Sequence, residues 1–183
     1  MNENIINIPN LLTLSRILLT PFVVYAILLE QAALALGLMF VAGISDMLDG
    51  VIAKRFNQHT VVGSYMDPIA DKLLLISSIV TLFIVDQVPL FLFLAVVFRD
   101  VIIVGGAVTY ELVTRRLKME PTILSKATTT LQIIYVLIIM LNMAMSLPEI
   151  VLQVAVWTTF VFTFLSGVHY MVAWTLKAVN EEI

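Results

Sequence analysis

Long apolar stretches separated by short polar links are the feature that most limits what this chain can fold into. A helix that crosses the hydrocarbon core of a bilayer needs roughly 20 predominantly apolar residues. Six stretches approach or exceed that length: 11–29, 32–56, 61–85, 88–113, 123–147 and 150–178. Because a backbone inside lipid must satisfy its own hydrogen bonds, each stretch is expected to be a helix. The sequence therefore predicts an all-α integral membrane protein with six transmembrane helices.

The composition supports the same class of protein. Hydrophobic residues make up 61% of the 183 and charged residues 13%, whereas a soluble domain has roughly 45–50% apolar and about 25% charged residues. The absence of cysteine excludes disulfides, thiolate zinc sites and cysteine nucleophiles. The polar start has no basic segment before the first apolar stretch, so we expect a retained first span rather than a cleaved signal peptide.

The links indicate the domain organisation and the orientation in the membrane. No link is rich in Gly, Ser or Pro, so residues 1–183 are expected to form one domain. Basic residues in short loops mark the cytoplasmic side. Lys54 and Arg55 flank the second link and Arg115 and Arg116 lie in the fourth, whereas the first, third and fifth links carry no Lys or Arg. With six spans, both termini are expected in the cytoplasm, and the protein in the inner (cytoplasmic) membrane.

Carboxylates stand inside two of the predicted helices, on either side of the second link. Asp46 and Asp49 are three residues apart before this link, and Asp67 and Asp71 are four apart after it. Residues at those spacings share one face of a helix. The link is short, so the two helices are expected to be antiparallel neighbours, and the four carboxylates are expected to converge at the cytoplasmic side of the membrane.

Such a cluster predicts bound cations. Four carboxylates in a low-dielectric site cannot all ionise unless they are protonated or neutralised by cations. Oxygen ligands without His or Cys suit Mg²⁺, Mn²⁺ or Ca²⁺ better than Zn²⁺, and paired metals hold the attacking and leaving oxygens of phosphoryl chemistry. The small residues Gly50, Ala53 and Gly63 leave space for a diphosphate, and Lys54 and Arg55 add positive charge beside it.

Two other interpretations of the cluster compete with this one. A single buried Asp in a membrane helix can be a structural hydrogen-bonding residue, although four at these spacings make that interpretation weak. An ion-coupled carrier also needs carboxylates in the membrane. Repeat symmetry, or a broken helix in matching halves, would favour a carrier, and neither is visible in the sequence.

The stretch from residue 46 to residue 71 resembles the signature of the CDP-alcohol phosphatidyltransferases. That pattern is D-x-x-D-G-x-x-A-R, eight residues, G, three residues, D, three residues, D. The matching positions here are Asp46, Asp49, Gly50, Ala53, Gly63, Asp67 and Asp71. Lys54 stands where the family usually has Arg, and Arg55 follows it. Lysine keeps the charge but lacks the planar fork for bidentate phosphate contacts, so either residue would take the usual arginine's role.

The resemblance implies a reaction and its partners. A member of this family transfers a phosphatidyl group from CDP-diacylglycerol to an alcohol and releases CMP. The resemblance further implies two divalent ions, Mg²⁺ or Mn²⁺, a homodimer surrounded by membrane lipids, an active site facing the cytoplasm and no nucleic-acid partner.

The resemblance also implies roles for particular residues. Asp46, Asp49 and Asp67 would bind the metals. Asp71 would join the second metal and act as general base for the acceptor hydroxyl. Three residues of the first span resemble family residues that border the nucleotide pocket: Asn10, Thr13 and Arg16. Their i,i+3 spacing would place them on one helix face.

The acceptor alcohol is indicated by the later stretches. Arg99 and Lys126, with Arg115 and Arg116 in the fourth link, could together bind an acceptor phosphate. Alternatively, Arg99 and Asp100 could each pair with other buried charges and be structural.

Two branches of the family share the opening N-I-P-N-L-L-T-x-x-R of residues 7–16. One branch uses glycerol 3-phosphate and makes phosphatidylglycerophosphate. The other, the single-domain cardiolipin synthases, uses phosphatidylglycerol. The segments 98–101 and 121–126 resemble the second branch more closely, which predicts phosphatidylglycerol as acceptor, with glycerol 3-phosphate as the alternative.

Overall fold

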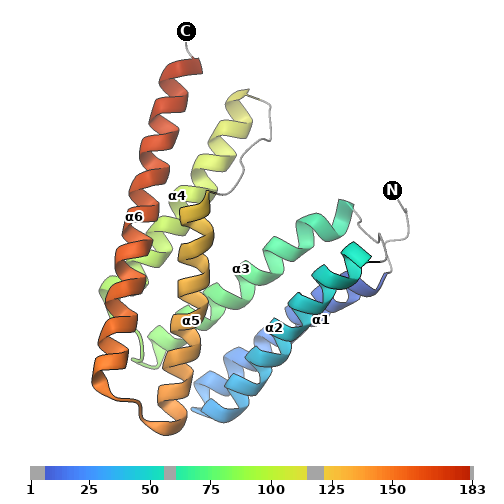
Figure 1. The fold of residues 1–183 in the computed structure, drawn as a ribbon, viewed down its shortest axis with the longest axis vertical. Helices are drawn as coiled ribbons and strands as arrows, with labels where there is room; N and C mark the ends of the chain where they lie inside the picture. Colours follow the sequence, from blue (N-terminus) through green and yellow to red (C-terminus); the bar gives the residue numbers. More distant parts are fainter. Residues whose placement is uncertain (1–6, 56–60, 115–121, 182–183) are drawn as a thin grey trace. The chain divides into compact units, whose positions relative to one another are not determined.

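The computed structural model describes residues 7–55, 61–114 and 122–181, and the regular structure within them is α-helical (Figure 1). The helices are α1 (Ile8–Leu28), α2 (Ala32–Arg55), α3 (Val61–Ile84), α4 (Leu90–Thr114), α5 (Ile123–Met145) and α6 (Glu149–Glu181). Some helix-end side chains, including those of 49–55 and 107–114, lie outside the description. The predicted all-α class is confirmed, and each helix begins and ends within three residues of its predicted stretch.

Three helices of the described chain are long and apolar enough to cross a membrane: Asn10–Leu28, Ile123–Met145 and Glu149–Leu176. Among the described side chains, α2 also has a shorter apolar stretch, Ala32–Leu48, which includes Asp46. In the first half of α3 stand Asp67, Asp71 and Lys72. These charged residues stand within an otherwise apolar helix. That all six helices cross a membrane, with both termini in the cytoplasm, stays a prediction.

α1 and α3 end in the same kind of turn. The backbones of Glu30 and Asp86 lie in the left-handed region, with φ of 55° and 57°. In each turn the N–H of the next residue, Gln31 or Gln87, donates at 2.9 Å to the carbonyl five residues earlier. This is a Schellman closure, which usually has glycine at the left-handed position. It ends both helices.

The first of two compact units contains α1, α2, α3 and the part of α5 from Val136 onward. In it, α1 packs against both α2 and α3. The described buried residues of α2 recur at helical spacing, and three of the four are small: Ala32, Ala35, Met39 and Ala42. Small residues let membrane helices approach closely. α1 is thus packed closely against the two helices that carry the predicted carboxylates.

The second unit contains α4, the part of α5 up to Tyr135, and α6. Here α4 packs against α6, and at Gly106 the backbone of α4 lies close to the ring of Trp174. A Cβ atom at position 106 would lie 2.7 Å from Cε2 of Trp174. Only glycine therefore leaves room for the indole ring against the backbone of α4. The predicted single domain of residues 1–183 stays a prediction.

Candidate active site

Three helices of the first unit bring opposite charges together. Arg16 of α1 points one guanidinium nitrogen, Nη1, at carboxylates from two other helices. Nη1 lies 2.8 Å from Oδ1 of Asp46 on α2 and also donates to Oδ1 of Asp71 on α3. One turn earlier, the hydroxyl of Thr13 donates to Oδ1 of Asp67 on α3. Three of the four carboxylates that the sequence singled out therefore gather against one side of α1.

That side of α1 is a buried polar face in an apolar helix. Its members follow helical spacing and are almost fully buried: Asn10 (8% exposed), Thr13 (0%), Arg16 (1%) and Thr20 (4%). The helix begins just before this face, where the Asn7 side chain caps it by accepting from the N–H of Asn10 at 3.0 Å. The predicted common face of Asn10, Thr13 and Arg16 is confirmed. A buried guanidinium needs a counter-charge, and the ion pairs to α2 and α3 provide it.

The carboxylates are more open than the arginine that holds them. The side chains of Asp46 and Asp71 are 48% and 50% exposed, whereas Arg16 is 1% exposed. Asp67 is half-buried. A ligand can therefore reach the carboxylate side of the cluster while the guanidinium closes the protein side. Ionised carboxylates only accept hydrogen bonds, so the open side suits a cation or a hydroxyl donor.

The donor set fits a divalent cation. Among the described side chains no group of three carboxylates or histidines is assembled as a complete metal site, and the side chain of Asp49, the fourth predicted ligand, lies outside them. Asp46 and Asp71 nevertheless already share one cationic group, the guanidinium of Arg16. Hard oxygen ligands placed close enough to share a cation are what Mg²⁺ or Mn²⁺ requires.

Several other predicted site residues lie outside the described side chains: Gly50, Ala53, Lys54, Arg55, Arg115 and Arg116. Gly63 is described, and it is buried near the start of α3.

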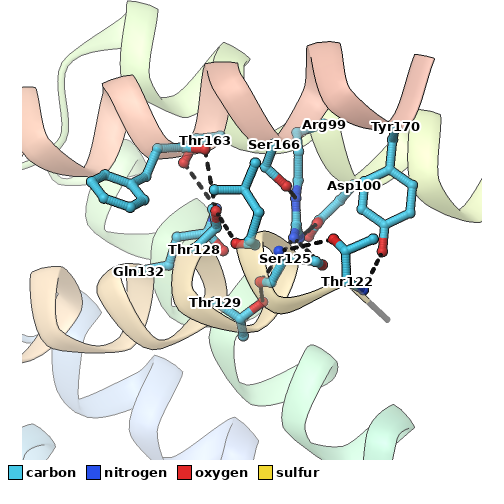
Figure 2. A network of polar contacts seen from close by, with 12 residues as sticks. Arg99, Asp100, Thr122, Ser125, Thr128, Thr129, Gln132, Thr163, Ser166 and Tyr170 are labelled. Atoms are coloured by element: carbon cyan, nitrogen blue, oxygen red, sulfur yellow. Dashed lines mark hydrogen bonds and ion pairs between the residues drawn. The ribbon is translucent and has the colours of Figure 1, made fainter. Parts of the chain in front are cut away.

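The second unit holds a separate polar network, shown in Figure 2. Arg99 and Asp100 of α4 are 3% and 7% exposed and pair with each other at 2.7 Å between Nη1 and Oδ1. They pair with each other, rather than each with another buried charge as the structural alternative supposed. Lys126, in the first turn of α5, is exposed.

Residues 6–165 of the chain match the family described as CDP-alcohol phosphatidyltransferase. The matched region contains all four predicted aspartates, together with Arg99 and Lys126. The chain belongs to this family.

Similar members of the CDP-alcohol phosphatidyltransferase family differ in name and length. The chain is 38% identical over 147 residues to a Drosophila melanogaster protein named "Probable cardiolipin synthase (CMP-forming)", covering 72% of this chain and 46% of that protein. It is 37% identical over 150 residues to the Homo sapiens "Cardiolipin synthase (CMP-forming)", covering 73% and 50%. A Rickettsia felis "CDP-diacylglycerol--glycerol-3-phosphate 3-phosphatidyltransferase" is 34% identical over 176 residues, covering 91% and 94%. The chain thus spans about half the length of the two animal relatives.

Two features of this family member were missed from the sequence. Arg16 was assigned to the border of the nucleotide pocket, without its ion pairs to Asp46 and Asp71. A lone arginine in an apolar helix signals a need for buried counter-charges, and the two nearest helices carry them. The polar face of α6 was also missed, although its residues recur at helical spacing and are buried: Thr159, Thr163, Ser166 and Tyr170.

Proposed function

We propose that this chain transfers a phosphatidyl group from CDP-diacylglycerol to phosphatidylglycerol, releasing CMP and forming cardiolipin. The observation that carries the proposal is the gathering of Asp46, Asp67 and Asp71 at a half-open site around the buried Arg16. Transfer of this kind requires carboxylates that hold cations against a diphosphate and one carboxylate that accepts a proton. The names of the relatives support the same reaction.

In the proposed reaction Asp71 takes the proton of the acceptor hydroxyl. The hydroxyl oxygen then attacks the phosphorus that carries the diacylglycerol. The bond between this phosphorus and the bridging oxygen breaks, and CMP leaves with the electron pair. Arg16 donates to one oxygen of Asp71 and orients the half-exposed carboxylate toward the open side. Positioning and charge neutralisation provide most of the rate in phosphoryl transfer.

Two divalent ions, Mg²⁺ or Mn²⁺, would be held by Asp46, Asp49, Asp67 and Asp71. When bound, they would neutralise the diphosphate and the departing CMP. The contact of Thr13 with Asp67 and those of Arg16 with Asp46 and Asp71 hold the described ligands from the side of α1. Lys54 or Arg55 would contribute a further positive charge at the diphosphate.

The charges of the second unit favour phosphatidylglycerol as the acceptor. Glycerol 3-phosphate is a small, nearly dianionic molecule that needs several fixed cations, whereas phosphatidylglycerol has one charge and two acyl chains. Among the described side chains of α4, α5 and α6, Lys126 is exposed and Arg99 is buried against protein partners. Within this described part of the chain, one accessible cation suits the singly charged lipid better than the dianion.

Glycerol 3-phosphate remains the second candidate acceptor. It is favoured by one observation, the alignment over 94% of the Rickettsia felis protein whose name contains this acceptor.

The proposed enzyme is a homodimer in the inner membrane, with six spans, cytoplasmic termini and a cytoplasmic active site. The position of the aspartates near the basic second link supports this orientation. Alkaline phosphatase and green fluorescent protein fused to the C-terminus test it, since only the second is active in the cytoplasm. An active phosphatase fusion would contradict the proposed topology.

A competition assay tests the reaction and the acceptor together. Purified protein receives CDP-diacylglycerol, Mg²⁺ or Mn²⁺, and both acceptors, and the lipid products and CMP are identified by mass spectrometry. We expect cardiolipin and CMP, with both lost in excess chelator. Phosphatidylglycerophosphate without cardiolipin would overturn the acceptor. Cation transport into vesicles without CMP release would favour a carrier.

Matched aspartate variants test the chemistry in the same assay. Asp71→Asn should lose turnover while retaining more CDP-diacylglycerol binding than Asp67→Asn. Asp86→Asn makes the same chemical change at an exposed turn after α3 and should leave CMP release intact. Near-normal turnover of Asp71→Asn would contradict its role as the base.

A further inference from the structure

Arg99 directs most of its guanidinium group at the protein (Figure 2). Nη1 donates to Oδ1 of Asp100 at 2.7 Å, and Nε donates to the hydroxyl of Ser166 on α6 at 3.4 Å. Nη2 donates to both the carbonyl oxygen and the hydroxyl of Ser125 on α5, at 3.2 and 2.6 Å. A guanidinium has five N–H donors, so these bonds leave little of it for a ligand.

The bond to the Ser125 carbonyl reaches the backbone next to Lys126. This carbonyl and the Lys126 nitrogen belong to the same rigid peptide unit. The Lys126 N–H donates to the carbonyl of Thr122 at 3.1 Å, and the hydroxyl of Thr129 donates to the Ser125 carbonyl at 3.1 Å. This peptide unit is therefore already hydrogen-bonded within α5, and Arg99 adds a hydrogen bond to it from α4.

The start of α5 is also tied to α6. Thr122 stands just before the helix, and its hydroxyl accepts from the Ser125 N–H at 3.2 Å, as an N-cap residue does. The Thr122 N–H in turn donates to the hydroxyl of Tyr170 on α6 at 3.5 Å. Tyr170 is 8% exposed. The first turn of α5 is therefore held from α4 by Arg99 and from α6 by Tyr170.

We propose that Arg99 is a positioning residue, which holds the first turn of α5 so that the exposed Lys126 meets the phosphate of the acceptor. The inference rests on the proposed function, because Lys126 binds an acceptor only if the chain is such a transferase. It differs from direct binding of the acceptor by Arg99. Arg99 acts through Ser125, and the residue that touches the acceptor phosphate is Lys126.

Kinetics of single and double variants separate the two roles. Arg99→Lys keeps a positive charge beside Asp100, which avoids an unpaired buried carboxylate, and Ser125→Ala removes only the hydroxyl. Each should raise the KM for phosphatidylglycerol about tenfold, the usual size for a lost charge-assisted hydrogen bond, with the KM for CDP-diacylglycerol unchanged. The double variant should be no worse than Arg99→Lys alone, because Arg99→Lys already breaks the contact that Ser125→Ala removes.

Direct binding by Arg99 predicts the opposite pattern. Ser125→Ala would then leave the acceptor KM unchanged, and the two substitutions would be additive; either result overturns the proposal. Thr175→Ala is the matched control, because its exposed hydroxyl donates only within α6, to the Met171 carbonyl. It should change neither KM.

A spin label tests the positioning without catalysis. The chain has no cysteine, so Ile123→Cys, 88% exposed in the first turn of α5, and Met145→Cys, 63% exposed at its other end, give unique label sites. Arg99→Lys and Ser125→Ala should increase mobility of the label at 123 but not at 145. An immobile label at 123 in both variants overturns the positioning role. A wild-type protein that releases no CMP overturns the proposed function instead.

Discussion

Replacing Arg16 by methionine removes the charge that α1 presents to α2 and α3 while keeping an unbranched side chain of adaptable shape. The variant loses the 2.8 Å pair with Asp46 and the hydrogen bond to Asp71. Hydrogen bonds to charged groups contribute roughly 1.5–3 kcal/mol each. Both carboxylates are about half exposed, so water replaces part of each contact. We therefore expect the free energy of unfolding to fall by about 2 kcal/mol.

Equilibrium unfolding in mixed micelles of dodecyl maltoside and sodium dodecyl sulfate, followed by circular dichroism in the presence of chelator, measures this loss. Thr20→Val is the matched control, because the buried Thr20 hydroxyl donates only to the Arg16 carbonyl of the same helix. It should cost less than about 1 kcal/mol. If Arg16→Met unfolds at the same detergent fraction as Thr20→Val, the contacts of Arg16 with Asp46 and Asp71 add no measurable stability, which refutes this reasoning.

A double-mutant cycle checks the cause of the loss. In the Asp71→Asn background, Arg16→Met should cost less than it does in the wild type, because one of its partners is already neutral. We expect a coupling of about 1 kcal/mol, within the range for residues in direct contact. Additive losses would mean that Arg16 stabilises the unit by packing alone.

Three further substitutions have expected outcomes. Gly106→Ala should lower the free energy of unfolding by about 1–3 kcal/mol, since its Cβ would meet the Trp174 ring at 2.7 Å. Gly105→Ala should not lower it, because a Cβ there would have nothing within 4 Å. The same detergent titration measures both. Asp86→Gly should raise the unfolding midpoint, because it removes a left-handed non-glycine residue that costs roughly 1 kcal/mol; a lower midpoint would contradict this. Lys54→Ala should strongly reduce CMP release while Lys54→Arg retains it, and loss of activity only on Arg55→Ala would move the diphosphate contact to that residue.

The sequence alone determined the helices and where their charges stand. Each helix begins and ends within three residues of its apolar stretch, because a backbone in lipid must hydrogen-bond within its own segment and hydrophobic length then sets helix length. The common face of Asn10, Thr13 and Arg16 also followed from helical periodicity. These properties are local in the chain. The gathering of the aspartates was predicted from the short link between their helices, but the described contacts that bring them together run through α1, which packs against both α2 and α3. That α2 and α3 are themselves antiparallel neighbours stays a prediction.

The partners of the buried charges were decided only by the tertiary structure. Thr13 and Asp67 are 54 positions apart in the chain, and Arg99 and Ser166 are 67 apart. A helix that is apolar on nearly every side gives little indication of which face meets a neighbour, because lipid and protein are equally acceptable surroundings for its side chains. The rotation of each helix about its axis therefore comes from packing. That rotation places Arg16 against the aspartates and turns Arg99 toward Asp100 and Ser125, within its own unit.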